Sequence, residues 1–218
     1  MIRKTLVSAA LFASAAAASA AVVDTTAAWN GSDALQPFGS PNTSTYGQVV
    51  KASGSQLDSF SFIVDLPDTL QFKAYAYAWD GVKATGPALF TSGVTSDNGS
   101  GFNSVAFSTG GAAVTNGQDY VLFLSISELY AANNGAGTGV FASVDAASYA
   151  DGDFYWFNDG GNFAALTSQN WEKWFPGDFA FTATFTDGAD NRVPEPGLLA
   201  LLGIGALGLA ASKRRKAA

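Results

Sequence analysis

Hydrophobic and polar side chains alternate with a period of two along the middle of the chain. Phe60, Phe62 and Val64 fall on one side of a single segment, and Ser59 and Ser61 fall on the other. Such alternation is typical of a β-strand with one buried face, because successive side chains point to opposite faces of a sheet. The segments that this pattern predicts as strands are 46–52, 57–65, 70–80, 88–92, 102–108, 120–127, 154–157 and 179–185.

Turn-forming residues separate these segments, and an amphipathic helical period nowhere holds for more than about two turns. Many short strands without intervening helices predict an all-β domain, an antiparallel jelly-roll-like β-sandwich, rather than an α/β fold. We expect the stretch 21–45 to be irregular. The Gly-, Ala- and Asn-rich stretch 131–139 is expected to be a long surface loop.

The beginning of the chain has the three parts of a secretory signal peptide. Arg3 and Lys4 are positive, residues 5–17 are apolar, and Ala18-Ser19-Ala20 is a small-residue cleavage site. We expect cleavage between Ala20 and Ala21, with Ala18 as the second small residue that the peptidase recognises. The alternative, an N-terminal anchor helix, is disfavoured because the apolar run is short and ends in small residues.

A short apolar run, 198–211, lies near the other end of the chain and precedes the basic cluster Lys213-Arg214-Arg215-Lys216. As a helix it would be roughly 21 Å long, which is short against the roughly 20 residues that cross a bilayer core. The basic cluster favours the cytoplasmic side, which leaves Pro194-Glu195-Pro196 on the outer face. Two prolines in three residues keep this peptide extended, so a processing enzyme can bind it.

These C-terminal features resemble the PEP-CTERM sorting signal of Gram-negative bacteria. The resemblance covers residues 193–216 and rests on Val193, Pro194, Glu195 and Pro196, the short apolar helix and the basic tail. It implies recognition by an exosortase at the inner membrane, membrane contact through the C-terminal hydrophobic sorting helix before processing, and an association with exopolysaccharide and biofilm matrix. An ordinary single-pass tail anchor is the alternative. The expected division is 1–20 signal peptide, 21–191 β-sandwich ectodomain and 192–218 sorting signal.

Charge is distributed unevenly between these parts. Residues 21–191 hold four lysines against 17 of the 18 acidic residues, which makes their net charge −13, against −7 for the whole chain. Such a surface repels nucleic acid and anionic lipid, so we expect neither as a partner of this domain. The chain has no Cys and no His, which excludes disulfides, thiol nucleophiles, Ser-His-Asp triads and the usual zinc sites.

Aromatic residues are the first candidates for a binding site, because a sugar ring packs its C–H face on an aromatic ring while nearby polar groups bond its hydroxyls. The competing interpretation is packing, since large aromatic side chains more often fill the core of a two-sheet domain. The candidate glycan platform consists of Tyr75, Tyr77, Trp79, Tyr155, Trp156, Trp171 and Trp174.

Carboxylates are the second group of candidates. Asp151 and Asp153 lie in an oxygen-rich turn that would suit a structural calcium ion, although turns favour Asp and Gly without any metal. No other cofactor is expected. A glycosidase needs two carboxyl groups about 5 to 10 Å apart, and Glu128, Glu172 and Asp153 are available, but their spacing selects no pair.

The segments 46–48, 75–81, 85–89 and 117–120 also resemble secreted bacterial β-sandwich domains of sorted proteins, which are similar to carbohydrate-binding jelly rolls. The sequence therefore predicts an exported, exosortase-processed protein of the bacterial cell surface or extracellular matrix. We expect it not to be an enzyme and to act as a structural or polysaccharide-associated module. A carbohydrate-active enzyme that uses paired carboxylates is the alternative, and an inert matrix component without a ligand is also compatible with the sequence.

Overall fold

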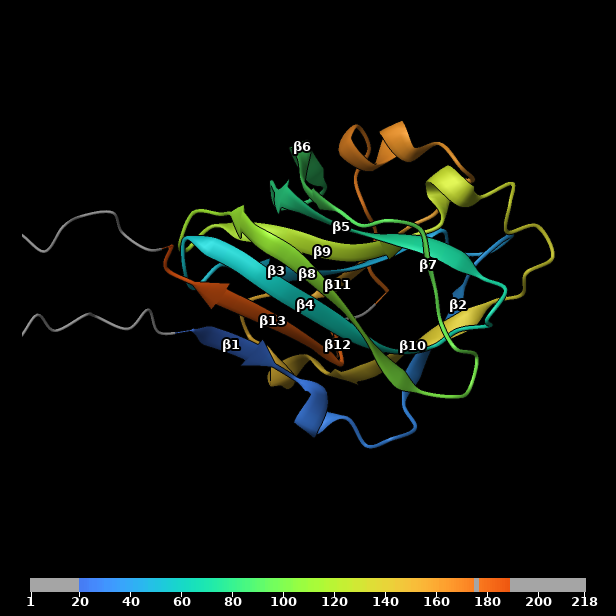
Figure 1. Cartoon of the computed structure of the whole chain (residues 1–218), viewed down its shortest axis with the longest axis horizontal. Coiled ribbons are helices and arrows are strands. Elements are labelled where there is room, and N and C mark those ends of the chain that lie inside the picture. Colours follow the sequence, from blue (N-terminus) through green and yellow to red (C-terminus); the bar gives the residue numbers. More distant parts are fainter. Residues whose placement is uncertain (1–19, 175–176, 189–218) are drawn as a thin grey trace, which may run out of the picture. The chain divides into compact units, whose positions relative to one another are not determined.

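Two antiparallel sheets pack face to face in a computed structural model that describes residues 20–174 and 177–188 (Figure 1). Within these residues, the first sheet has seven strands. Its order is β1 (Ala21–Asp24), β13 (Phe181–Thr186), β4 (Gln56–Asp65), β10 (Gly139–Asp145) and β12 (Gly177–Phe179), with β2 (Ala34–Phe38) beside β10 and β8 (Asn103–Ala113) beside β4.

The second sheet has six strands within the same described residues. Its order is β11 (Phe154–Phe157), β3 (Thr45–Lys51), β9 (Asp119–Ser125), β5 (Gln71–Trp79) and β6 (Ala84–Thr91), with β7 (Thr95–Ser96) beside β5. Short 3-10 helices interrupt the connections: η1 (Thr26–Ala28), η2 (Ser127–Leu129), η3 (Ala146–Ser148) and η4 (Phe163–Thr167).

Apolar side chains from both sheets fill the space between them. Phe60, Phe62 and Val64 of β4 are almost wholly buried there, as their alternation predicts. Phe181 and Phe185 of β13 are fully buried in the same core. Each such side chain contributes about 1.5 to 3 kcal/mol by leaving water, so this core drives the pairing of the sheets. The predicted all-β, antiparallel β-sandwich is confirmed.

A second apolar cluster covers the outer face of the six-stranded sheet. Tyr75, Tyr77 and Trp79 of β5 point to this face, while Phe72 and the alanines of β5 point to the inner core. The segment with η4 lies over the same face (Figure 1) and contributes Leu166 and Trp171 to the cluster. Trp171 is held there because its indole N–H donates to the Leu166 carbonyl at 2.8 Å and its backbone N–H donates to the Val82 carbonyl at 2.8 Å. Strands β5 and β9 are therefore covered on both faces.

Several strands were not indicated by the sequence pattern. The stretch 21–45, expected to be irregular, contains β1 and β2, and β10 begins where the expected long loop 131–139 ends. These strands are set by their partners: β1 has only four residues, which pair with β13 from Ala21↔Phe185 to Asp24↔Thr182. Gly86 and Pro87 lie inside β6, an edge strand, where Gly and Pro are tolerated.

The chain enters and leaves the sandwich at the same end. Residue 20 precedes β1, whose first residue lies opposite Phe185, and Thr186 in turn pairs with Gln56 at the start of β4. Strand β4 then runs to the other end, where Asp65 pairs with Val140 near the start of β10. The loops 39–44, 126–138 and 158–162 are attached to strand ends on that other side (Figure 1). We call this side the far end.

The sorting motif, the sorting helix and all of the signal peptide except Ala20 lie outside the described residues. In the part that is described, no helix combines the length and the apolar character needed to cross a membrane.

Candidate functional site

The structure divides the seven candidate aromatic residues into two groups. Tyr75, Tyr77, Trp79 and Trp171 lie in the outer cluster and are at most 9% exposed. Their rings pack on neighbours: Tyr75 stacks on Phe123 with ring centroids 4.9 Å apart, and Trp79 meets Trp171 edge-on at 5.6 Å. The faces of these four rings are not open to a sugar. The prediction that these residues form a glycan-binding platform is therefore corrected. The physical reason is the segment with η4, which covers this sheet face.

The other three, Tyr155, Trp156 and Trp174, lie at the edge of the six-stranded sheet, where β11 is the outermost strand. Trp174 is 48% exposed, and its ring centroid lies 5.2 Å from that of Trp156. Trp156 and Glu172 exchange two backbone hydrogen bonds of 2.8 and 3.0 Å. This bridge holds the tryptophan segment alongside β11. We call the following residues the β11 edge: Asp153, Tyr155, Trp156, Glu172, Lys173 and Trp174.

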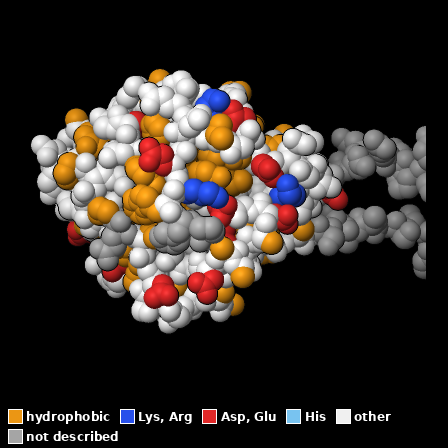
Figure 2. Space-filling model, turned by 180° about the vertical axis from the view of Figure 1, so that it is seen from behind, with side chains coloured by type: hydrophobic (Ala, Val, Ile, Leu, Met, Phe, Trp, Pro, Cys, Tyr) orange, Lys and Arg blue, Asp and Glu red, His pale blue; other side chains and the backbone are white. Residues whose placement is uncertain are grey.

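Charged groups lie next to the aromatic rings of the β11 edge. Lys173 Nζ is 2.6 Å from Asp153 Oδ2 and 5.6 Å from the centroid of the Tyr155 ring. The hydrogen bond to Asp153 raises the pKa of Lys173, which therefore stays protonated. Figure 2 shows the same mixture on one face of the molecule, where hydrophobic side chains gather beside lysine and acidic side chains. The ion pair lies beside Tyr155, whose side chain points to the opposite sheet face from that of Trp156.

The indole N–H of Trp156 near this edge is buried and has no hydrogen-bond partner among the described atoms. The buried phenol O–H of Tyr46 lies near the Thr43 side chain, which opposes the rise of its pKa. Tyr46 and Trp156 lie opposite each other in the β3–β11 pairing, so their side chains point to the same face. Burial raises the pKa of Tyr46 to about 12, which keeps its proton in place. An unpaired buried donor costs about 1 to 3 kcal/mol.

The carboxylates considered for catalysis take part in separate interactions. Glu128 Oε2 accepts from Lys73 Nζ at 2.5 Å and from Tyr75 Oη at 3.0 Å, and the hydrogen bond from Lys73 lowers the pKa of Glu128. Asp153 pairs with Lys173, whereas Glu172 is exposed. Within the described residues, no hydrogen bond joins any two of these carboxylates. The absence of enzymatic activity stays a prediction.

The calcium prediction on Asp151 and Asp153 also remains untested. Asp151 is exposed, while Asp153 accepts from Lys173 through Oδ2 and from the Gly177 backbone N–H through Oδ1 at 3.4 Å. Across residues 20–174 and 177–188, no three Asp, Glu, His or Cys side chains are grouped as metal ligands would be. A calcium ion at this turn would therefore have to compete with Lys173 for Asp153.

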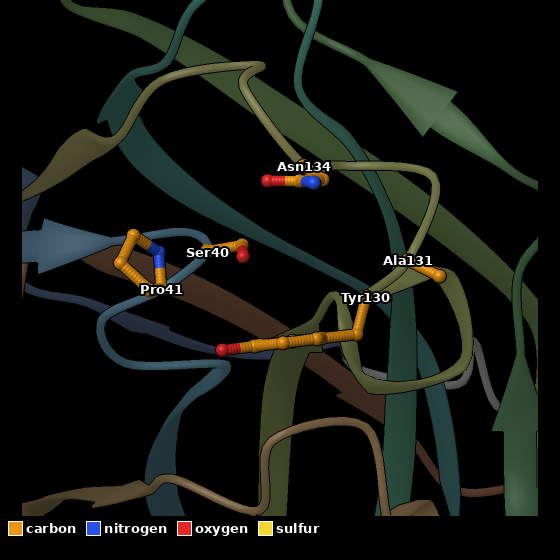
Figure 3. A pocket seen from close by; sticks show the side chains of 5 residues that line it. All are labelled: Ser40, Pro41, Tyr130, Ala131 and Asn134. Carbon is orange, nitrogen blue, oxygen red and sulfur yellow. The ribbon is translucent and has the colours of Figure 1, made fainter.

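The far end contains a hollow of ≈ 380 Å³ that the sequence did not indicate (Figure 3). Its wall comes from the turn between β2 and β3 and from the loop after η2. These segments are distant in sequence, and each has the composition of an ordinary surface turn. The lining residues are Ser40, Pro41, Tyr130, Ala131 and Asn134.

Comparison with known proteins identifies one motif in the chain. Residues 192–216 match the PEP-CTERM protein-sorting motif, which confirms the resemblance of the C-terminal region. A comparison with curated proteins gives no match.

Two solved structures are similar to the chain. One contains the cysteine protease and lectin-like domains of Cwp84, a surface layer associated protein of Clostridium difficile, with 15% identity and a TM-score of 0.43 over 67% of this chain and 33% of that one. The other is the clostridial cysteine protease Cwp84 after propeptide cleavage, with 17% identity and a TM-score of 0.45 over 71% of this chain and 38% of that one. The chain thus spans little more than a third of the length of these two structures.

The sorting motif marks an exported protein that exosortase processes. The described residues before it form a β-sandwich with both chain exits at one end. The chain therefore combines the PEP-CTERM protein-sorting motif with a β-sandwich domain.

Proposed function

We propose that this protein is a non-enzymatic component of the cell surface or extracellular matrix of a Gram-negative bacterium, and that its sandwich binds exopolysaccharide at the β11 edge. The observation that carries the proposal is Trp174. It is the most exposed of the candidate aromatic residues, and its ring lies beside that of Trp156. The other large hydrophobic side chains exposed in the described residues are valines, which offer no flat ring.

The chemistry beside Trp174 supports a sugar as the ligand. The Lys173–Asp153 ion pair provides a donor and an acceptor beside the Tyr155 ring, in the residue next to Trp174, and hydroxyl groups can bond to both. Because Trp174 lies exposed on the surface beside β11, the β11 edge suits an internal stretch of a polysaccharide chain.

The charge of the domain favours a neutral polysaccharide. With a net charge of −13 over residues 21–191, the domain repels strongly anionic polymers at low salt. The same charge keeps a matrix protein soluble at high local concentration. A neutral polymer is bound without this repulsion, and its affinity should therefore depend weakly on ionic strength.

Titration of the purified full-length chain tests the proposal. The protein is kept in a detergent without a sugar headgroup and titrated with the exopolysaccharide of the producing bacterium, while tryptophan fluorescence and calorimetric heat are recorded. We expect saturable binding that is lost in Trp174→Ala. Trp29→Phe is the control, because it also removes one fluorophore but lies away from the β11 edge.

Equal binding by Trp174→Ala and the unchanged protein would refute the β11 edge as the binding site. Reducing ends are measured in the same samples after prolonged incubation. Their accumulation would show hydrolysis and replace this proposal with the carbohydrate-active enzyme that uses carboxylates.

A further inference from the structure

The hollow at the far end has a rigid framework. Asn133 is fully buried, and its side chain bonds to three backbone groups. Its Nδ2 donates to the carbonyls of Gln71 at 2.8 Å and Leu129 at 3.0 Å, and its Oδ1 accepts from the Gln71 backbone N–H at 2.8 Å. These bonds fix the loop after η2 to the start of β5. The two lining residues on either side of Asn133 in the sequence, Ala131 and Asn134, are held in place by this attachment.

A second set of contacts supports the same loop from the other side. Asp159 accepts hydrogen bonds from Ser44 Oγ at 2.7 Å and from Ser127 Oγ. Gly161 packs closely on Tyr130: a Cβ on this glycine would lie 3.1 Å from the Tyr130 Cβ, and its φ of +97° favours glycine as well. The polar residues behind the hollow are thus used to join three loops.

The polar groups that line the hollow, in contrast, are free. Within the described part of the chain, Ser40 Oγ, Tyr130 Oη and the Asn134 side-chain amide take part in no hydrogen bond of the protein. In Figure 3 the Tyr130 side chain reaches across the hollow toward Pro41, with Ser40 and Asn134 on one side of it. No lining residue carries a charge. The hollow offers hydroxyl and amide groups that both donate and accept, next to an aromatic ring.

The hollow also lies at the far end, opposite the end where residues 20 and 188 leave the sandwich (Figure 1). A domain held through its C-terminal side therefore keeps this site away from the point of attachment. Its volume is at the lower limit of ordinary ligand pockets, which hold about 300 to 1,000 Å³. A ligand of one or two sugar rings is compatible with that size.

We propose that the far-end hollow is a second binding site, and that it takes a neutral sugar unit such as the end of a glycan chain. The ring of the ligand packs on Tyr130, and its hydroxyls bond to Ser40 and Asn134. The site goes beyond the proposed function because it does not use Trp174, so each proposal can fail without the other.

The test uses the full-length chain labelled with ¹⁵N, in a detergent without a sugar headgroup. It is titrated with the methyl glycosides of glucose, galactose and mannose and with N-acetylglucosamine, with glucuronic acid as the charged comparison. We expect saturable amide shifts in the loops 39–44 and 126–138 for at least one neutral sugar and weaker binding of glucuronic acid. Ala131→Trp should abolish these shifts by filling the hollow, because Ala131 is exposed and its replacement leaves the core intact.

Tyr130→Ala should weaken binding about tenfold, the equivalent of one aromatic contact. Tyr130→Phe keeps the ring and the packing and should retain most of the affinity, which separates loss of a contact from loss of fold. Trp174→Ala is the matched control and should bind the small sugars normally. Unchanged shifts in Ala131→Trp, or no shifts with any sugar of the panel, would overturn the proposal.

Discussion

A buried carboxylate should make the stability of the sandwich depend on pH. Asp178 of β12 is fully buried, and the negative charge of Asp153 also acts on it. Asp178 Oδ1 accepts from Gln48 Nε2 at 2.7 Å, and its Oδ2 accepts from the Tyr149 backbone N–H at 3.1 Å. Burial raises the pKa of Asp178 from 3.8 to about 7, although the Gln48 hydrogen bond opposes this change.

The raised pKa determines both the sign and the size of the effect. The folded protein prefers protonated Asp178, so the favourable contribution is complete below the unfolded pKa of 3.8 and is lost as the pH rises through about 7. One pKa unit corresponds to about 1.4 kcal/mol, which gives a total loss of about 4 kcal/mol. Between about pH 5 and about pH 8, the free energy of unfolding should fall by about 2.5 kcal/mol from this group alone.

Urea unfolding of the full-length chain, followed by near-ultraviolet circular dichroism, measures this dependence. Asp178→Asn cannot ionise and should remove the decrease, although the lost acceptor costs about 1 kcal/mol at every pH. Asp187→Asn removes the same charge from an exposed position and should keep the decrease. If Asp178→Asn and the unchanged protein had parallel stability curves between these pH values, the assignment of a neutral buried carboxyl group would be refuted.

Two further predictions concern the sorting motif and the outer cluster. Replacing Pro194 and Pro196 with Ala should leave export intact but accumulate an unprocessed form in the inner membrane, visible by membrane fractionation and intact mass; normal processing would contradict recognition of the motif by exosortase. Gly47→Ala should destabilise the sandwich by about 1 to 3 kcal/mol, because a Cβ at this position would lie 2.9 Å from both Trp171 and Val121 side-chain atoms. Thermal unfolding checks this value, and an unchanged Tm would show that Trp171 moves without cost.

Local alternation was sufficient to predict the strands that build the inner core. Phe60 and Phe62 of β4 and the phenylalanines of β13 are buried as their period of two requires, because one face of each strand must leave water. The sorting motif could be recognised for a different reason: its prolines, apolar run and basic tail are contiguous in the sequence. Both inferences depend on residues close to one another in the chain.

Short partner-dependent strands could not be predicted in the same way. The four residues of β1 form a strand because β13 provides backbone partners for them, and β10 is defined by its pairing with β2, β4 and β12. A strand of four residues, such as β1, has too few residues to show a period. The backbone partners of β1 lie in β13, which is more than 100 residues away in the sequence.

The roles of the aromatic residues and the position of the hollow were decided by long-range packing. The alternating face of Tyr75, Tyr77 and Trp79 was visible in the sequence, but only the folded chain brings Trp171 over that face. Trp174, three residues later, stays exposed because the chain has by then turned to the β11 edge. The alternation thus determines which side chains share a face, whereas the tertiary structure determines whether a face meets water or another segment.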